Sequence, residues 1–120
     1  MIRQGEVYWA DLGSPVGSSP GYLRPYVVVQ NNVFNDSPIR TTVVCAVTSN
    51  LRRARALGNV LLEEGEADLP EPSVVNVSQL LTVGKEQLVD RIGVLSKARL
   101  VEILRGILLV LTPRSVPRQI

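Results

Sequence analysis

Arg24 is the residue whose type and setting best suit chemistry on a phosphate group. Residues 13–25 form a glycine- and serine-rich segment that ends in Arg24-Pro25, and Pro25 begins the apolar run Pro25–Asn31. Because proline restricts the residue before it to extended conformations, the backbone carrying Arg24 is predicted to be stiff although the preceding loop is loose. A planar guanidinium held in this way beside a polar loop is well suited to bind phosphate oxygens.

Two polar runs stand at the ends of apolar segments and offer hydroxyl and amide groups. Residues 48–50 are Thr-Ser-Asn and follow the apolar run 43–47, while residues 30–32 are Gln-Asn-Asn and follow the valines at 27–29. Because residues at strand ends lie on the rim of a sheet, both runs are candidates to line a polar cleft. Each run also has the composition of a turn or a helix cap. The residue types alone therefore predict a polar cleft that contains one well-positioned arginine.

The residues that the chain lacks exclude several kinds of chemistry. It has no histidine, which excludes histidine-based acid–base catalysis and most zinc sites. Its single cysteine, Cys45, lies within an apolar run and is predicted to be a buried thiol rather than a nucleophile. Acidic residues gather only over 63–71, without the spacing of a calcium loop. The glycines at 13, 17 and 21 precede a strand, whereas a nucleotide fingerprint precedes a helix. We therefore expect no metal site and no cofactor.

Composition and charge indicate one domain of a cytoplasmic protein. The 120 residues are 45% hydrophobic and 20% charged, as in ordinary globular proteins. One cysteine permits no disulfide within the chain, which fits a reducing compartment, and neither a signal peptide nor a membrane-spanning run is evident. The net charge is +2, with +3 in residues 1–60 and −1 in residues 61–120. We expect a single domain over residues 1–112 and a tail over 113–120 that can be disordered.

Continuous and alternating apolar segments predict a mainly β fold with short strands. The expected strands are 6–11, 25–31, 41–49, 59–62 and 91–95, and residues 73–77 and 80–83 are expected to be short strands or turns. The unbroken valines at 27–29 indicate burial on both faces of the sheet. Between the strands we expect a turn-rich connection over 32–40, a short helix over 51–57 capped by Asn50, and a solvated acidic loop over 63–72.

One long helix is predicted over Lys97–Leu111, with Ser96 as its N-cap and Pro113 ending it. Its apolar residues recur at spacings of three and four and form one wide stripe: Leu100, Ile103, Leu104, Ile107, Leu108 and Leu111. Burying these side chains contributes on the order of 10 kcal/mol before entropy is subtracted. The helix is therefore expected to pack on the sheet or on a second subunit. Several short strands followed by a terminal helix predict a small curled barrel covered by that helix.

Taken together, these segments resemble the MazF/PemK family of toxin endoribonucleases. The similar segments are Gly5–Leu12, Pro15–Ser18, Arg24–Asn32 with Asn35, Val43–Ser49, Gly58–Val60, Ser73–Gln79 and Asp90–Gly93. The resemblance covers about residues 4–111. Its most specific part is the combination of an Arg-Pro after a Gly-Ser loop with a Thr-Ser strand end some two dozen residues later. It implies an SH3-like barrel with short helices and one C-terminal helix, working as a homodimer.

The resemblance also implies a reaction, which is sequence-specific and metal-independent cleavage of single-stranded RNA. The family's catalytic arginine and threonine correspond to Arg24 and Thr48. In the family mechanism the 2′-OH attacks the adjacent phosphate and leaves a 2′,3′-cyclic phosphate and a 5′-OH end. Because arginine is hardly ever deprotonated, we assign Arg24 to stabilising the charge at phosphorus, with proton donation to the leaving oxygen as a second role. Thr48 is assigned a hydrogen bond to a non-bridging oxygen.

RNA and an antitoxin are the partners that the resemblance implies. The residues expected to contact RNA are Ser18, Ser19, Tyr22, Gln30, Asn31, Ser49 and Gln79, with Tyr22 as a stacking group. A MazE-like cognate antitoxin is expected to cover the RNA groove with a segment that folds on binding. The chain departs from the family at Ser19, where many members carry an acid, and at Leu81, where relatives often carry a base. The recognition sequence therefore cannot be transferred.

Two other functions remain open from the sequence. A non-catalytic toxin of the same fold would bind a protein target such as DNA gyrase through the end of its last helix. Such toxins use an aromatic residue near the C-terminus, whereas the only tryptophan here is Trp9. A passive single-strand binder would need more stacking platforms than five aromatic residues provide. Cleavage of labelled RNA in the presence of EDTA separates these alternatives from the nuclease.

Overall fold

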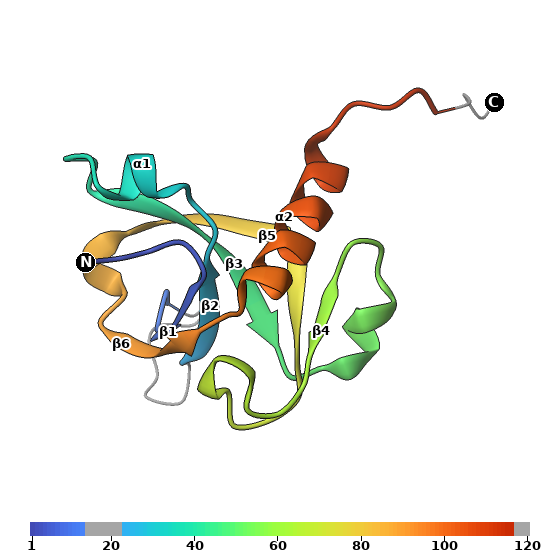
Figure 1. The fold of residues 1–120 in the computed structure, drawn as a ribbon, viewed down its shortest axis with the longest axis horizontal. Coiled ribbons are helices and arrows are strands. Elements are labelled where there is room, and N and C mark those ends of the chain that lie inside the picture. The colour runs from blue at the N-terminus through green and yellow to red at the C-terminus, as the bar shows by residue number, and fades with distance from the viewer. Residues whose placement is uncertain (14–22, 117–120) are drawn as a thin grey trace.

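The computed structural model describes residues 1–13 and 23–116 of the chain. In these residues six strands form one curled sheet in the order β4-β5-β3-β2-β1-β6, and all neighbouring strands are antiparallel (Figure 1). The strands are β1 Glu6–Ala10, β2 Arg24–Val28, β3 Thr41–Thr48, β4 Val60–Leu62, β5 Ser73–Gly84 and β6 Asp90–Val94. The predicted mainly β fold with a C-terminal helix is confirmed.

Short helices join the strands, and one long helix follows them. They are α1 Asn32–Asn35, the 3-10 turns Leu51–Arg55, Glu66–Asp68 and Lys85–Gln87, and α2 Lys97–Leu111. The side chain of Asn50 accepts a hydrogen bond from the backbone of Arg52, and that of Ser96 accepts one from Arg99. Both predicted N-caps are therefore confirmed, although the first helix is shorter than expected. Within the described ranges, no helix has the length and apolar character needed to cross a membrane.

The sheet buries side chains on both of its faces. The larger cluster lies between the sheet and α2 and includes Val7, Val27, Cys45, Val47, Leu62, Val75, Val77, Ile103 and Ile107. The smaller cluster lies on the other face and consists of Tyr8, Ala10, Val28, Val44, Val83 and Leu88. Because Val27 belongs to the first cluster and Val28 to the second, β2 is covered on both faces, as its run of valines predicted.

β5 is one continuous strand, which corrects the prediction of two separate short strands or turns over 73–77 and 80–83. Against β3, Ala46 pairs with Asn76 while the neighbouring Cys45 pairs with Leu80. The three intervening residues of β5 form a bulge that does not end the strand. The polar Ser78-Gln79 pair, which resembles a turn in the sequence, is the exposed part of this bulge.

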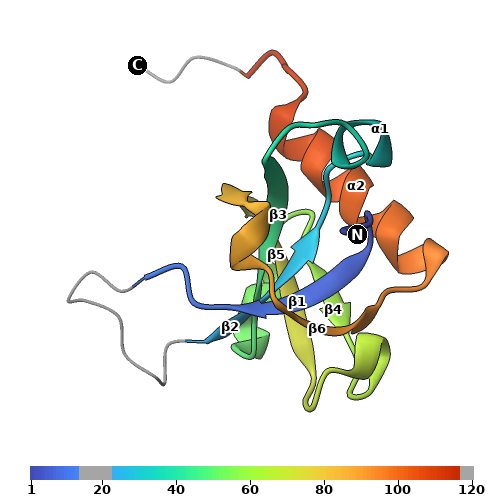
Figure 2. The ribbon, with the colours of Figure 1, turned by 90° about the vertical axis from the view of Figure 1, so that its left-hand side faces the viewer.

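α2 packs on the sheet along only part of its length. Its contacts are with β4 and β5, and its C-terminal half extends past β5 in Figure 1, while Figure 2 shows the helix along one side of the strands. Ile103 is fully buried, whereas Leu108 and Leu111 are 60% and 63% exposed. Of the two predicted coverings, the sheet therefore buries only the first part of the stripe, and a second subunit stays the prediction for its last turn. That turn reaches beyond the strands and has nothing of the same chain to cover it among the described residues.

Two glycines set the distance between α2 and the loop before β4. Gly58 has a φ of +82°, a conformation that other residues rarely adopt. A Cβ atom at Gly58 would lie 3.3 Å from the Cα of Gly106, and a Cβ atom at Gly106 would overlap the carbonyl oxygen of Gly58. Only glycine at both positions allows the helix backbone to approach the loop this closely.

Glu6 is a buried carboxylate that ties three segments together. Its oxygens accept hydrogen bonds from Arg91 Nη1 at 2.7 Å, from the backbone of Arg3 at 2.7 Å and from the Tyr8 hydroxyl at 3.0 Å. Burial by itself raises the pKa of Glu6, but these hydrogen bonds outweigh it and hold the pKa below its ordinary value. Burial and the hydrogen bond to Glu6 raise the pKa of Tyr8 to about 12.

Candidate active site

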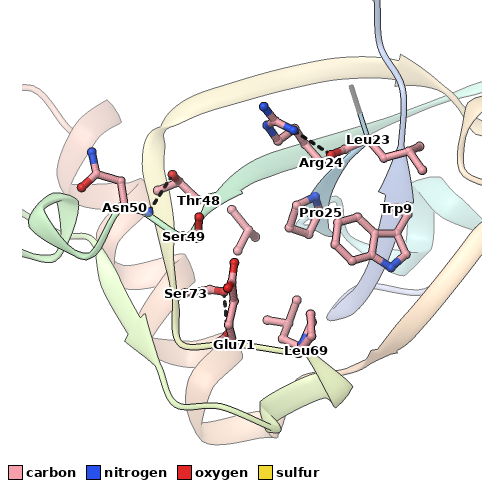
Figure 3. A pocket seen from close by; sticks show the side chains of 12 residues that line it. Trp9, Leu23, Arg24, Pro25, Thr48, Ser49, Asn50, Leu69, Glu71 and Ser73 are labelled. Atoms are coloured by element: carbon pink, nitrogen blue, oxygen red, sulfur yellow. Dashed lines mark hydrogen bonds between the residues drawn. The ribbon is translucent and has the colours of Figure 1, made fainter. Parts of the chain in front are cut away.

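A pocket of about 480 Å³ opens at one end of the sheet (Figure 3). Its lining comes from the ends of β1 and β3, the starts of β2 and β5, and the connections beside them: Trp9, Leu23, Arg24, Pro25, Val47, Thr48, Ser49, Asn50, Leu69, Pro70, Glu71 and Ser73. Arg24 and Thr48, which the sequence predicts to be the catalytic pair, thus line the same pocket although 23 residues separate them in the chain.

Strand register explains why these two residues line the same pocket. β2 and β3 are antiparallel neighbours in which Tyr26 pairs with Ala46 and Val28 with Val44. Continuing this register by two residues sets Arg24 opposite Thr48. Residues directly opposite on neighbouring strands point to the same face, with Cβ atoms about 4.5–5.5 Å apart. The antiparallel pairing of β2 and β3 therefore brings Arg24 and Thr48 to one pocket.

Arg24 stands on a well-defined backbone, as its proline neighbour predicted. β2 begins at Arg24, one residue earlier than expected, and Pro25 pairs with Trp9 of β1. Pairing of β2 with β3 begins only at Tyr26, so the missing N–H of Pro25 removes no bond from that ladder. Arg24 Nη1 donates a hydrogen bond to the carbonyl oxygen of Leu23 at 2.9 Å. This bond holds the exposed guanidinium close to its own backbone.

Thr48 is fixed at the last position of β3. Its Oγ1 accepts a hydrogen bond from the backbone N–H of Asn50 at 3.1 Å. Since a hydroxyl both accepts and donates, the hydroxyl hydrogen remains to be donated into the pocket. The side chain of Asn50 accepts from the backbone of Arg52 at 3.2 Å, so its oxygen caps the following 3-10 turn. Ser49 lies exposed between them and lines the pocket, where the sequence predicted an RNA contact.

The rest of the lining divides into an apolar wall and a polar edge. Trp9, Pro25 and Leu69 form the wall, and Leu69 is only 2% exposed. Glu71 and Ser73 form the polar edge, which lies across the pocket from Arg24 in Figure 3. Ser73 Oγ donates a hydrogen bond to the carbonyl oxygen of Glu71 at 2.9 Å and orders this part of the loop.

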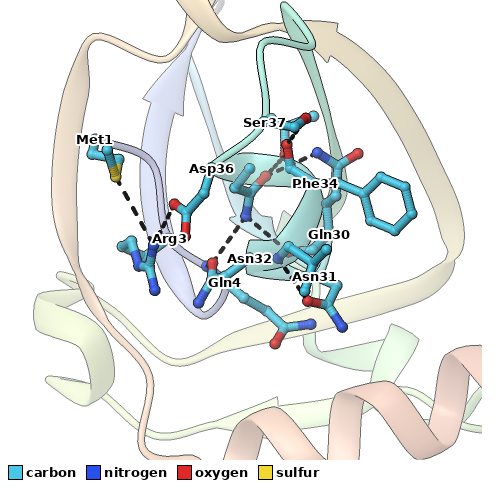
Figure 4. Close-up of polar contacts among 12 residues, drawn as sticks. Met1, Arg3, Gln4, Gln30, Asn31, Asn32, Phe34, Asp36 and Ser37 are labelled. Carbon is cyan, nitrogen blue, oxygen red and sulfur yellow. Dashed lines mark hydrogen bonds and ion pairs between the residues drawn. The ribbon is translucent and has the colours of Figure 1, made fainter.

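Gln30 and Asn31 lie toward the other end of β2 and do not line the pocket. Gln30 Nε2 donates to Asn35 Oδ1 at 2.9 Å and to the carbonyl oxygen of Thr41 at 3.3 Å. Asn31 Oδ1 accepts from the backbone of Val33 at 2.8 Å and caps α1 (Figure 4). Gln30 therefore connects α1 to the start of β3 and Asn31 caps α1, while their contact with RNA stays a prediction.

The other predicted RNA contacts are also outside the pocket. Gln79 is exposed on the bulge of β5 and is not part of the pocket lining. Ser18, Ser19 and Tyr22 lie outside the described residues. Of the nine residues predicted for the site, the structure thus brings together Arg24, Thr48 and Ser49.

Trp9 and Glu71 are pocket residues that the sequence analysis did not assign to the site. Trp9 appeared there as part of a strand, and Glu71 as one acid of a solvated loop. A signal for Glu71 was available, because the prolines at 70 and 72 flank it and stiffen the backbone as Pro25 does for Arg24. For Trp9 only its place in β1, across from Pro25, reveals the role.

Cys45 has the inert character that the sequence predicted. It is fully buried, its Sγ donates a hydrogen bond to the carbonyl oxygen of Asn76 at 2.9 Å, and burial raises its pKa to about 12. A thiol in this state is not a nucleophile at neutral pH. Histidine, cysteine and acidic side chains also do not gather in groups of three or more suited to a metal ion anywhere in the described ranges.

The chemistry of the pocket is that of anion binding beside an apolar surface. A guanidinium offers paired N–H donors that match two oxygens of a phosphate, and the Thr48 hydroxyl adds a third donor on the neighbouring strand. The wall formed by Trp9 and Leu69 suits a flat, apolar group attached to that phosphate. A nucleotide unit combines these two features.

Comparison with known sequences agrees with this chemistry. Residues 3–111 match the model of a family described as PemK-like, MazF-like toxin of type II toxin-antitoxin system. The chain is 40% identical over 111 residues to endoribonuclease MazF6 of Mycobacterium tuberculosis, which covers 92% of this chain and 97% of that protein. It is 36% identical over 104 residues to endoribonuclease MazF of Staphylococcus epidermidis, covering 86% of this chain and 85% of that protein.

Solved structures share the fold at lower sequence identity. One is an endoribonuclease in complex with its cognate antitoxin from a mycobacterial species, with a TM-score of 0.77 and 24% identity, covering 96% of this chain and 100% of that chain. Another is the Mycobacterium tuberculosis toxin MazF-mt6, with a TM-score of 0.70 and 19% identity, covering 87% of this chain and 93% of that chain. The architecture of strands and terminal helix is common to them.

Proposed function

Because this chain belongs to the PemK-like, MazF-like family of type II toxins, we propose that it is a sequence-specific endoribonuclease in which Arg24 and Thr48 promote cleavage of single-stranded RNA. One observation carries the assignment of these residues: both line a single pocket, from neighbouring strands. Relatives at 40% and 36% identity are named endoribonucleases. The alternative of a non-catalytic toxin has no comparable observation in its favour.

The reaction uses the ribose of the substrate as its nucleophile. The 2′-oxygen forms a bond to the adjacent phosphorus and its proton passes to water, while the bond from phosphorus to the 5′-oxygen breaks and that oxygen takes up a proton. The products are a 2′,3′-cyclic phosphate and a 5′-OH end. Arg24 balances the charge that develops on the phosphorane oxygens, and Thr48 donates to a non-bridging oxygen. A well-placed donor of this kind lowers a barrier by about 3–4 kcal/mol.

The substrate is single-stranded because attack by the 2′-oxygen requires it to stand in line with the leaving oxygen. Base-paired RNA holds its backbone in a regular helix that does not allow this arrangement, whereas a single strand can splay around the phosphate. We propose that no metal ion is needed, since the ribose supplies the nucleophile and Arg24 the positive charge. Chelators then leave the rate unchanged.

We propose further that the protein works as a cytoplasmic homodimer controlled by a cognate antitoxin. The last turn of α2 leaves Leu108, Val110 and Leu111 exposed by 60%, 45% and 63%, which is a surface that a second copy can cover. An antitoxin segment that folds on binding would close the RNA site reversibly.

The test is cleavage of a long, defined single-stranded transcript in the presence of EDTA, with the cut sites mapped and the new ends identified. We expect cyclic phosphate and 5′-OH ends at a small set of sequences. A short RNA around one mapped site, carrying deoxyribose at the position of attack, should resist cleavage. If that substrate is cut as fast as the ribose form, or if wild-type protein leaves the transcript intact, the proposed reaction is wrong.

A further inference from the structure

Among the described residues, one carboxylate lines the pocket, that of the exposed Glu71, and prolines restrict the backbone on both sides of it. Glu71 follows Pro70 and precedes Pro72, so the backbone on both sides is restricted. Leu69 anchors the segment at one end, where it is 2% exposed in the larger core cluster. At the other end Ser73, which begins β5, donates its hydroxyl hydrogen to the Glu71 carbonyl oxygen at 2.9 Å.

The Glu71 side chain is directed into the pocket. In Figure 3 it rises from the lower edge, with Arg24 at the upper edge, Thr48 to one side and Trp9 to the other. Its carboxylate forms no ion pair or side-chain hydrogen bond with any of residues 1–13 or 23–116. A carboxylate only accepts hydrogen bonds. The group that meets it must therefore be a donor, which excludes the phosphate that Arg24 and Thr48 are suited to hold.

The wall beside Glu71 is shaped for a flat ring. Trp9 lies on β1 across from Pro25, and both border the pocket together with Leu69. Bases of single-stranded RNA are commonly recognised by stacking on an aromatic side chain and by hydrogen bonds to their edges. A volume of about 480 Å³ is within the range of small-molecule sites and accommodates one nucleotide.

Resting on the proposed function, we infer that this pocket is a guanine subsite, with the base stacked on Trp9 and its Watson–Crick edge bound by Glu71. Guanine presents two adjacent N–H donors on that edge, from N1 and the exocyclic N2, and these match the two oxygens of one carboxylate. Adenine presents one donor beside an acceptor, cytosine one donor followed by two acceptors, and uracil one donor between two acceptors. Against a carboxylate, each of those acceptors would be left unpaired and opposed by negative charge.

The inference gives this chain a source of selectivity of its own. Glu71 supplies a carboxylate to the pocket from the connection between β4 and β5. The preference for guanine at the cut site then depends on Glu71, while the rate of bond cleavage depends on Arg24 and Thr48.

Nucleotide binding tests the subsite without relying on cleavage. The chain has one tryptophan, so its fluorescence reports on Trp9 alone. The probes are the 3′-monophosphates of guanosine, inosine and uridine, since inosine lacks only the exocyclic amino group of guanine. We expect quenching by the guanosine nucleotide with affinity about tenfold or more above that of the other two. Glu71→Gln should bring the three affinities within about threefold of one another. Glu64→Gln, an exposed acid of the same loop outside the pocket, should keep the wild-type ratio.

Three results would overturn the inference: no quenching by the guanosine nucleotide, equal affinity for all three nucleotides, or an unchanged ratio in Glu71→Gln. Cleavage gives a second and separate reading. Wild-type cut sites should carry guanine at one fixed position beside the cut bond, and Glu71→Gln should relax that position while still cleaving. If the wild-type protein cleaves no RNA, the proposed function fails, yet the nucleotide titration still decides whether guanine binds. If RNA is cleaved without any guanine requirement, the subsite fails and the nuclease stands.

Discussion

Arg24 and Thr48 occupy one row of residues that runs across the middle of the sheet. Ala10 of β1 pairs with Arg24, and Thr48 pairs with Val74 of β5. The β2–β3 ladder begins at the Tyr26–Ala46 pair, and extending its register by two residues sets Arg24 opposite Thr48. Arg24 is therefore positioned by its pairing with β1, and Thr48 by its pairing with β5.

Replacing Arg24 should reduce cleavage without unfolding the protein. Arg24→Ala removes the guanidinium that balances charge at phosphorus, and we expect the single-turnover rate on a mapped RNA site to fall by about a hundredfold or more. Arg40→Ala, another exposed arginine that does not line the pocket, is the matched control and should retain the wild-type rate. A rate for Arg24→Ala within tenfold of wild type would refute the assignment.

Thr48 should act through its hydroxyl rather than through its shape. Thr48→Val keeps the branched side chain but loses the donor, so we expect a fall of about ten- to a hundredfold in kcat with little change in KM. Thr48→Ser restores a hydroxyl and should recover most of the rate. Equal rates for the valine and serine variants would show that the hydroxyl takes no part in the reaction.

The Glu6 carboxylate should make stability depend on acid pH. Because its pKa is lowered in the folded protein, the unfolded chain binds the proton first as the pH falls, and stability is lost from the ordinary pKa of 4.5 downward through the folded value. Glu6→Gln should lower the free energy of unfolding at neutral pH by about 1–3 kcal/mol. Urea denaturation at neutral pH and at about pH 3 should show a smaller acid loss in Glu6→Gln than in wild type. An acid loss as large as that of wild type would contradict this role, and Glu64→Gln serves as the control.

The glycine contact between α2 and the loop before β4 should tolerate no side chain. Alanine favours helices by about 1 kcal/mol over glycine, but its Cβ at position 106 would overlap the carbonyl oxygen of Gly58 and approach Val77 Cγ1 to 3.0 Å. Overpacking of this kind costs about 1–3 kcal/mol, so Gly106→Ala should melt at a lower temperature than wild type. Arg105→Ala, at the exposed neighbouring position, should change the melting temperature little. A Gly106→Ala protein as stable as wild type would mean that the loop can move away.

The exposed last turn of α2 should be covered in a dimer. Light scattering of the wild-type protein should give twice the chain mass of 13.1 kDa. Introducing charge with Leu108→Glu and Leu111→Glu together should halve that mass, because two buried carboxylates would lack partners. Val89→Glu, at a position 75% exposed outside α2, should leave the dimer intact. A double variant that keeps the dimer mass places the interface elsewhere.

Local signals predicted α2 best. The bounds Lys97–Leu111 agree with the prediction at both ends, because the Ser96 cap and the apolar spacing are encoded in adjacent residues. Which part of the apolar stripe the sheet covers depends on where the sheet ends, which neighbouring residues do not encode. The sequence therefore left open whether Leu108 packs on the sheet or on a second subunit. β5 was divided for a similar reason, since only its partner strand β3 keeps the ladder continuous across the bulge.

The sequence predicted what kind of site this is, but not every residue that lines it. Arg24 and Thr48 follow from motif resemblance, and the strand register places them together as expected. Trp9 and Glu71 enter the pocket only because β1, β2 and the acidic connection converge in space. Gln30 and Asn31 were predicted from their polar side chains to contact RNA. In the structure Gln30 donates a hydrogen bond to the Asn35 side chain and Asn31 caps α1.

Because the site is formed by interior strands of the sheet, its location limits the ways in which its activity can be restrained. The backbones of Arg24 and Thr48 stay at the same pocket as long as β2 and β3 remain paired, and separating these strands would dismantle the core. The folded sheet therefore keeps both residues at the site. An occupant of the pocket mouth would restrain them without unfolding the sheet, and that restraint would last only as long as the occupant survives.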